Sequence, residues 1–123
     1  MIIAVDFDGT VVEHDWPNIG ALKPNAVKVL RYLSSQGHKL IIWTCRTKNN
    51  PIDGRDTYAE AYQFMLDNNI PFDAFNDNVN NRFGSGSYPK VFADVYIDDK
   101  QLGGIPNDWN DILTMLRTHH DVL

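Results

Sequence analysis

The chain has 123 residues, 43% of them hydrophobic and 22% charged, and its net charge is −5. This length and balance suit one folded domain over residues 1–123, and they exclude a disordered chain or a set of membrane spans. An acidic chain has no general attraction to nucleic acid, so we expect no nucleic-acid partner. A phosphorylated ligand would need a local positive group or a bound cation.

Apolar runs and helical spacings alternate along the chain. We expect strands over residues 2–5, 40–43, 72–75 and 91–97, and helices that open at Pro24, run over 56–68 and run over 109–118. This alternation predicts an α/β layer fold with a mainly parallel central sheet.

Two segments between these elements have the composition of loops. Residues 11–23 (VVEHDWPNIGALK) show no clear period and contain a proline and a glycine, so we expect a flap in the form of a loop or small hairpin. On this flap, His14 is expected to be a solvated residue, and Trp16 either stacks on a ring of the substrate or covers the core. Residues 76–89 carry four asparagines and are expected to form a loop.

Cys45 is the only cysteine, so no disulfide can form within the chain, which fits a reducing compartment. The apolar run at the start of the chain stops at Asp6 and has no basic segment before it, unlike a signal peptide or a membrane span. We therefore expect a cytoplasmic protein with no membrane partner.

Polar residues collect at the carboxyl ends of the predicted strands. They are Asp6 and Asp8, Thr44 and Arg46, and Asp98 and Asp99. Ligands of an open α/β sheet bind beyond these ends, so one crevice would hold four carboxylates, a hydroxyl and a guanidinium. Asp6 and Asp8 are two positions apart and can face the same site. Lys90 lies at the other end of the last strand or on the loop before it.

Four carboxylates in one crevice repel one another unless a cation lies between them. At about 4 Å and an effective dielectric constant near 20, each close pair costs about 4 kcal/mol. Oxygen ligands favour a hard divalent ion, and Mg²⁺ is the usual partner of phosphate groups, so we predict Mg²⁺ as the cofactor. Arg46 is a further candidate for substrate binding, because a guanidinium matches the geometry of anionic groups.

The run Asp6-Phe7-Asp8-Gly9-Thr10 resembles the first signature of the haloacid dehalogenase (HAD) superfamily. Thr44 is similar to the second signature, Lys90 to the third and Asp98-Asp99 to the fourth, although only seven residues separate Lys90 from Asp98. The resemblance covers nearly the whole chain. It implies a three-layer, Rossmann-like HAD fold and a hydrolase that acts on phosphate esters.

The resemblance also implies a role for each matching residue. Asp6 would attack phosphorus and form an aspartyl-phosphate, while Asp8 would protonate the leaving oxygen and then activate water. Thr44 and Lys90 would hold the phosphoryl oxygens. The implied ligands of Mg²⁺ are Asp6, the backbone carbonyl of Asp8, and the pair Asp98 and Asp99, with Asp99 favoured as the direct ligand.

Members of this superfamily often carry a cap domain, inserted after the first signature or after the third strand. The corresponding gaps here, residues 11–23 and 76–89, have room only for a flap and a loop. The chain therefore resembles capless members, which act on substrates with open access or form homo-oligomers in which a neighbour closes the site. We expect a small phosphorylated substrate, whose identity the sequence does not reveal.

Three other interpretations stay open at this stage. A receiver-type signalling domain places its phosphorylated Asp after the third strand, whereas the Asp-rich run here follows the first. A catalytically silent HAD-like binding module would keep the fold without the reaction. A phosphotransferase would have to exclude water, which a chain without a cap does poorly.

Overall fold

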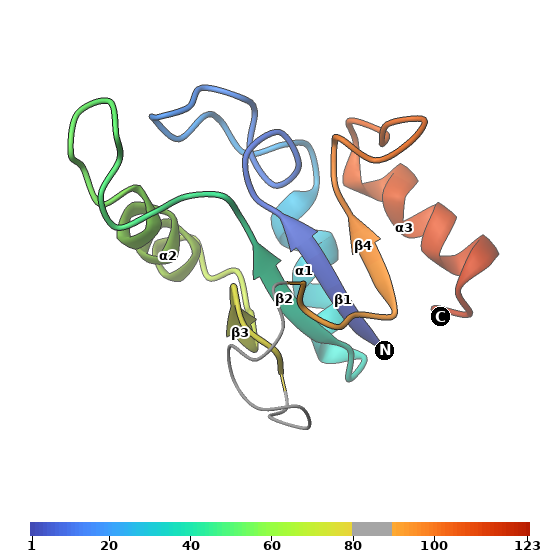
Figure 1. Cartoon of the computed structure of the whole chain (residues 1–123). Coiled ribbons are helices and arrows are strands. Elements are labelled where there is room, and N and C mark those ends of the chain that lie inside the picture. The colour runs from blue at the N-terminus through green and yellow to red at the C-terminus, as the bar shows by residue number, and fades with distance from the viewer. Residues whose placement is uncertain (80–89) are drawn as a thin grey trace.

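The structure is a computed structural model that describes residues 1–79 and 90–123. Within these ranges the elements are β1 (Ile2–Asp6), α1 (Ala26–Ser35), β2 (Lys39–Trp43), α2 (Thr57–Asp67), β3 (Ala74–Phe75), β4 (Val95–Ile97) and α3 (Trp109–His119). Figure 1 shows the strands side by side with their carboxyl ends on one side of the molecule. The long loops gather beyond these ends.

The sheet formed by the described residues has four strands in the order β3-β2-β1-β4, and every neighbouring pair is parallel. Asp6 of β1 lies opposite Trp43 of β2, and Val5 lies opposite Ile97 of β4. Helices flank this sheet, so the predicted α/β, Rossmann-like fold with a parallel sheet is confirmed.

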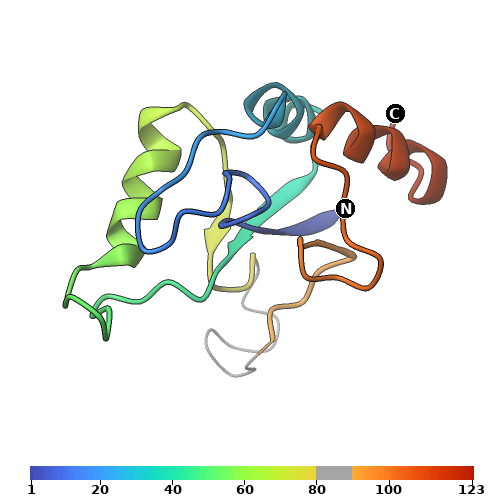
Figure 2. The same ribbon diagram turned by 90° about the horizontal axis from the view of Figure 1, so that it is seen from above.

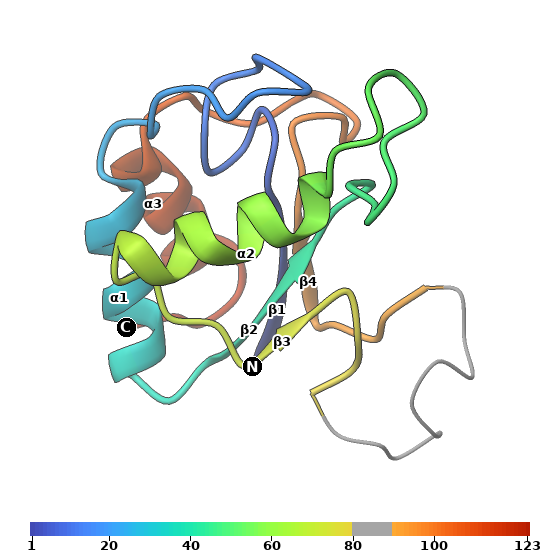
Figure 3. The same ribbon diagram turned by 90° about the vertical axis from the view of Figure 1, so that its left-hand side faces the viewer.

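The helices lie on one face of the sheet, as the views from above and from the side show (Figures 2 and 3). Alternate strand residues such as Ile3 and Val5 point to this face and pack with buried residues of α1, α2 and α3 in one core cluster. The opposite face, around Ala4 and Ile41, is covered by Val91 and Ala93 of the segment that leads to β4. An extended chain, and not a helix, therefore forms the layer on that face.

The direction of the chain explains this arrangement. From β1 through α1, β2 and α2 to β3, the chain moves stepwise toward one edge with its helices on one face (Figure 1). To reach β4 on the other side of β1, a right-handed connection must return across the opposite face. The strand order therefore reverses between β1 and β4, and a crevice at such a point is where open α/β sheets bind ligands.

The last two strands are shorter than predicted. The strand expected over residues 91–97 begins only at Val95, because the preceding residues cross the face of the sheet. The Tyr96 hydroxyl fixes that crossing, since it donates to the Val91 carbonyl at 2.7 Å and accepts from the Ala93 amide at 3.2 Å. The strand expected over 72–75 keeps only Ala74–Phe75. Most of the predicted loop at 76–89 lies outside the described residues.

The helix predictions hold to within two residues at each end. Asp56 and Asp108 cap α2 and α3 by accepting from the amides of Ala59 and Asn110, as side-chain oxygens at helix starts commonly do. The first helix begins at Ala26, two residues after the expected opening. In the described part of the chain, no helix combines the length and the apolar character that crossing a bilayer requires.

The predicted flap at residues 11–23 is a narrow hairpin whose base is part of the core. Val11 and Val12 are fully buried, and Val12 bridges Leu22 in antiparallel pairing. The Glu13 amide donates to the Ala21 carbonyl at 2.8 Å, and the Lys23 amide donates to the Val11 carbonyl at 3.0 Å. The tip of the flap thus projects over the carboxyl ends of the strands from a fixed base.

Candidate functional site

The loop after β1 turns sharply at Gly9. Its amide donates to the Val12 carbonyl at 2.8 Å, and its φ is +87°, a conformation that glycine adopts without strain. A Cβ at this position would collide with Oδ2 of Asp99 and with the ring of His14. Gly9 therefore allows the loop after β4 and the flap to approach the end of β1.

Three carboxylates meet where β1 and β4 end. Asp6, Asp98 and Asp99 each offer one oxygen, and these oxygens lie within 4.8 Å of one another. We call these three residues the acidic cluster. The strand-end pattern of the sequence predicted four carboxylates in one crevice, and the structure brings three of them together, without Asp8, at the point where the strand order reverses.

Thr10 joins the two halves of the acidic cluster. Its hydroxyl donates to Oδ2 of Asp6 at 2.9 Å and accepts from the backbone amide of Asp99 at 3.0 Å. Its carbonyl accepts from the Trp109 indole at 2.9 Å, and Thr10 is fully buried. No separate role for Thr10 was predicted from the sequence. The residue's place in the Asp6–Thr10 run is the signal that could have found it.

Within the acidic cluster, the pKa values of Asp6 and Asp99 shift in opposite directions. Burial, followed by the charge of Asp98, raises the pKa of Asp6 to about 8. Burial alone would also raise the pKa of Asp99, but hydrogen bonds with Asp6, His14 and Asp98 outweigh it and lower that pKa. Burial and the neighbouring carboxylates thus disfavour the charged form of Asp6, and a bound cation would stabilise it. This oxygen-only set of donors fits a hard divalent cation such as Mg²⁺.

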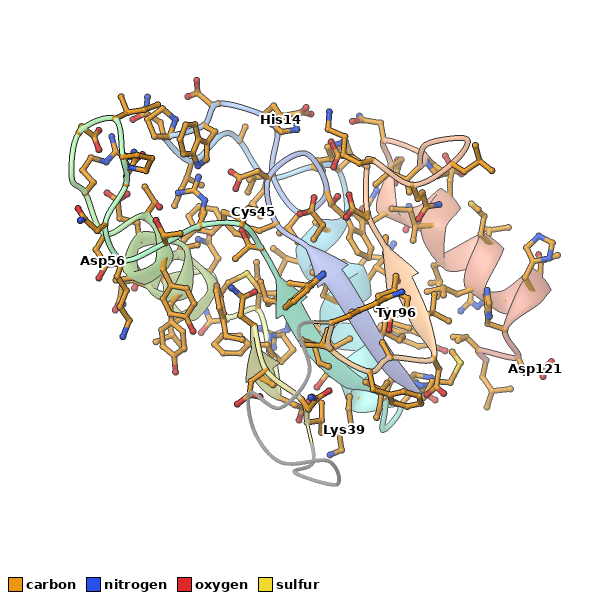
Figure 4. All side chains as sticks on the ribbon, in the orientation of Figure 1. His14, Lys39, Cys45, Asp56, Tyr96 and Asp121 are labelled. Carbon is orange, nitrogen blue, oxygen red and sulfur yellow. The ribbon has the colours of Figure 1, made fainter. Side chains whose placement is uncertain are left out.

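His14 reaches the acidic cluster from the flap. Its Nε2 lies 3.0 Å from Oδ2 of Asp99, although about half of the His14 side chain is exposed. Figure 4 shows His14 beyond the carboxyl ends of the strands, with Lys39 at the opposite end of the sheet. His14 is thus the exposed loop residue that the sequence predicts, with an additional contact to Asp99. The contact depends on how the predicted flap folds over the end of β1, which no local feature of the sequence determines.

Asp8 is held apart from the acidic cluster by Arg46. The guanidinium binds it with both edges of the fork: Nε donates to Oδ2 at 2.8 Å and an Nη donates to Oδ1 at 2.7 Å. The Arg46 side chain is fully buried, and that of Asp8 is 12% exposed. Such bidentate pairs fix both the distance and the plane of a carboxylate.

The other donors of Arg46 are also engaged. One Nη donates to the carbonyls of Pro17 and Thr57, and the second donates to the carbonyl of Asn18 as well as to Asp8. A guanidinium has five N–H donors, and each has an acceptor here. The prediction that Arg46 binds substrate is therefore not favoured by this conformation, in which the side chain is committed to protein contacts.

Thr44 lies just beyond β2, and an asparagine fixes its backbone. Asn76 accepts from the Thr44 amide at 2.7 Å and donates to the Thr44 carbonyl at 2.9 Å. The Thr44 hydroxyl accepts from the Arg46 amide at 3.2 Å, which leaves its own proton free to be donated to a ligand. The predicted role of Thr44 as a phosphate donor is compatible with this geometry and stays a prediction.

Lys90 is exposed, and its ammonium lies 4.6 Å from the centroid of the Tyr96 ring. Tyr96 precedes Asp98 by two positions and lies opposite Ala4, which precedes Asp6 by two. Lys90 thus lies on the face of the sheet from which these two aspartates extend. No carboxylate of residues 1–79 or 90–123 lies within 4.0 Å of its ammonium. Its contact with phosphate therefore stays a prediction.

Comparisons with known proteins place the chain beside a solved structure. No protein-family model matches the chain, and no curated protein matches it. A structure described as that of a conserved protein coded by a locus of Bacteroides thetaiotaomicron superposes with a TM-score of 0.79 and is 37% identical in sequence. The match covers 96% of this chain and 90% of the other. The chain therefore belongs to the same family as this conserved Bacteroides protein.

Proposed function

We propose that the protein is a Mg²⁺-dependent phosphomonoester hydrolase of the HAD type, acting on a small phosphorylated substrate through an aspartyl-phosphate on Asp6. The observation that carries the proposal is that Asp6 and Asp8, two positions apart in the chain, lie in different electrostatic environments. Asp6 lies in an acidic cluster that only the half-exposed His14 faces among the basic residues of the described ranges, and Asp8 is fixed by a buried guanidinium. A nucleophile and an acid–base group need such separate environments.

The acidic cluster supports the choice of cofactor. The residues that would hold Mg²⁺ are Asp6, Asp98 and Asp99, together with the backbone carbonyl of Asp8. When bound, the ion would neutralise the repulsion between the attacking carboxylate and the phosphate and would stabilise charge in the transition state. The raised pKa of Asp6 supports the assignment, because burial and the neighbouring carboxylates disfavour its charged form, which a bound cation would stabilise.

The residues of the chain account for both halves of the reaction. The Asp6 carboxylate attacks phosphorus as the bond from phosphorus to the leaving oxygen breaks, and Asp8 donates a proton to that oxygen. A water molecule then attacks the phosphorus of the aspartyl-phosphate, its proton passes to Asp8, and the Asp6 carboxylate is released with inorganic phosphate. Thr44 and Lys90 are proposed to donate hydrogen bonds to the phosphoryl oxygens throughout.

Access to this site is controlled by the flap at residues 11–23. The flap is a hairpin with no room for a cap domain, so we propose a substrate with open access or a homo-oligomer in which a neighbouring copy helps to close the site. Trp16, which is 43% exposed at the tip of the flap, is available to contact the substrate. We propose a cytoplasmic location on the basis of the single cysteine.

Mg²⁺-dependent release of phosphate tests the function directly. We expect wild-type protein to hydrolyse p-nitrophenyl phosphate with Mg²⁺ and to lose this activity in EDTA. Asp6→Asn should lower kcat by at least about 10⁴-fold, as removal of a nucleophile does. Asp67→Asn, on the exposed side of α2, is the matched control and should behave as wild type.

Two outcomes would contradict the proposal. A pure, folded wild-type protein that releases no phosphate from a broad panel of phosphate esters would favour the catalytically silent binding module. Full activity in Asp6→Asn would exclude Asp6 as the nucleophile.

A further inference from the structure

We infer that Arg46 is a positioning residue that couples the flap to the orientation of Asp8. The inference rests on the proposed function, because it concerns the acid–base step of that reaction. It replaces the expected role of Arg46 in substrate binding with one that acts through Asp8.

The first half of the coupling is the fork between Arg46 and Asp8. Bonds of 2.8 and 2.7 Å engage both oxygens of the carboxylate, so the guanidinium determines the plane in which Asp8 presents its free lone pairs. Arg46 also lies over the ring of Phe7, the residue between the two catalytic aspartates, with 5.4 Å from its Cζ to the ring centroid. Both contacts belong to the loop that ends β1.

The second half is the contact with the flap. Arg46 donates to the Pro17 carbonyl at 3.2 Å and to the Asn18 carbonyl at 2.8 Å, at the tip of the flap. Arg55 binds the same two residues: it donates to the Pro17 carbonyl at 2.7 Å and to Oδ1 of Asn18 at 3.0 Å. Unlike Arg46, Arg55 has no contact with Asp8 among the described residues.

Burial makes the two halves interdependent. The Arg46 side chain has no exposed surface, so a donor that loses its acceptor cannot be satisfied by bulk water without a rearrangement. Leaving a buried donor unsatisfied costs about 1–3 kcal/mol, and more when the group is charged. When the tip of the flap moves away, two of the five donors lose their acceptors. The guanidinium must then shift, and Asp8 shifts with it.

Dependence on the leaving group distinguishes this role from a merely structural one. In wild-type holoenzyme, kcat/KM would be measured for p-nitrophenyl phosphate, whose leaving group needs little protonation, and for ethyl phosphate, whose leaving group needs an acid. Arg46→Lys keeps the charge but loses the fork. We expect kcat/KM for ethyl phosphate to fall roughly 10²-fold, within the range of acid–base contributions, and that for p-nitrophenyl phosphate to fall far less.

Two more variants complete the design. Asp67→Asn is the matched control: it lies on the exposed side of α2 and should leave kcat/KM for both substrates unchanged. Pro17→Gly loosens the tip of the flap while Arg46 and Asp8 stay intact. Coupling predicts that Pro17→Gly lowers kcat/KM for ethyl phosphate more than for p-nitrophenyl phosphate, and this variant carries the test if Arg46→Lys does not fold.

The outcomes separate this inference from the function on which it rests. If wild type hydrolyses neither ester, the proposed function fails. If wild type is active but Arg46→Lys, or Pro17→Gly in its place, lowers kcat/KM for both esters by the same factor, the positioning role is wrong and the function stands.

Discussion

Asp6 and Asp8 are two residues apart, yet they belong to regions with opposite electrostatics. Asp6 lies in the acidic cluster with Asp98 and Asp99, where no buried cation of the described residues compensates the charge. Asp8 lies against a buried guanidinium whose five donors are all engaged. The fold thus leaves the Asp6 carboxylate without a buried positive partner and places the full positive charge of Arg46 against the Asp8 carboxylate.

This difference shows how a short loop can place two like groups in unlike electrostatic environments. An uncompensated cluster destabilises the empty protein and gains most from a cation. A compensated buried pair stabilises the fold only while both partners remain. Removal of a charge should therefore have opposite effects on stability in the two regions, and the following measurements test this contrast.

The largest effect is expected at the buried pair. Arg46→Met leaves Asp8 without its partner and should lower the free energy of unfolding by about 3–5 kcal/mol, the usual penalty for breaking a buried ion pair. Urea denaturation measures this value. The double variant Asp8→Asn with Arg46→Met should recover much of the loss, and Arg55→Met, at a more exposed pair, should cost about 1 kcal/mol or less. A loss below 1 kcal/mol in Arg46→Met would contradict the contrast.

An intermediate effect is expected when the acidic cluster binds its ion. At a Mg²⁺ concentration one hundred times Kd, binding stabilises the folded state by about 2.7 kcal/mol, which raises Tm by roughly 8 °C for a chain of this size. Thermal melts with Mg²⁺ and with EDTA measure the shift. Asp99→Asn should lose most of it, while Asp67→Asn should keep it. An unchanged Tm of wild type at millimolar Mg²⁺ would argue against a metal site here.

The smallest effect concerns the empty cluster and depends on pH. Because the pKa of Asp6 is raised from 3.8 to about 8, the folded protein binds a proton that the unfolded chain releases, and stability falls as pH rises between these values. Without Mg²⁺, Asp6→Asn should escape this fall. We expect it to be about 2 kcal/mol more stable than wild type at pH 8, since solvent screens a partly exposed group.

The comparison of Asp6→Asn with wild type at pH 4 serves as the control, because the two proteins should then differ little. The lowered pKa of Asp99 acts in the opposite sense, but only as pH falls below about 3.8, outside the measured window. A stability difference that does not grow between pH 4 and pH 8 would show that Asp6 lacks the expected environment.

Much of the fold and half of the site could be predicted from the sequence. Buried apolar runs, helical spacings and capping aspartates such as Asp56 are local signals, and they located the helices and the two central strands. The convergence of Asp6 with Asp98 and Asp99 followed from one rule, that parallel strands end at the same edge of a sheet. No knowledge of loop conformation was needed for either.

The remaining contacts depend on how loops fold against one another. Arg46 pairs with Asp8 because the flap and the start of α2 enclose its side chain, and His14 meets Asp99 because the hairpin leans over β1. These two contacts join residues that are separated by 38 and by 85 positions in the chain. No periodicity of the sequence predicts such pairs. Lys90 was assigned by resemblance alone, and its position over Tyr96 was not foreseeable.

The contacts of Thr10 have a consequence for the synthesis of the protein. Its hydroxyl and carbonyl bind groups that lie 89 and 99 positions later in the chain, on either side of the turn that follows β4. A ribosome makes Asp6 and Thr10 long before Asp99 and Trp109, the residues to which Thr10 binds. These contacts can therefore form only after Trp109 has left the ribosome, and until then the nascent chain carries Asp6 and Thr10 without these partners.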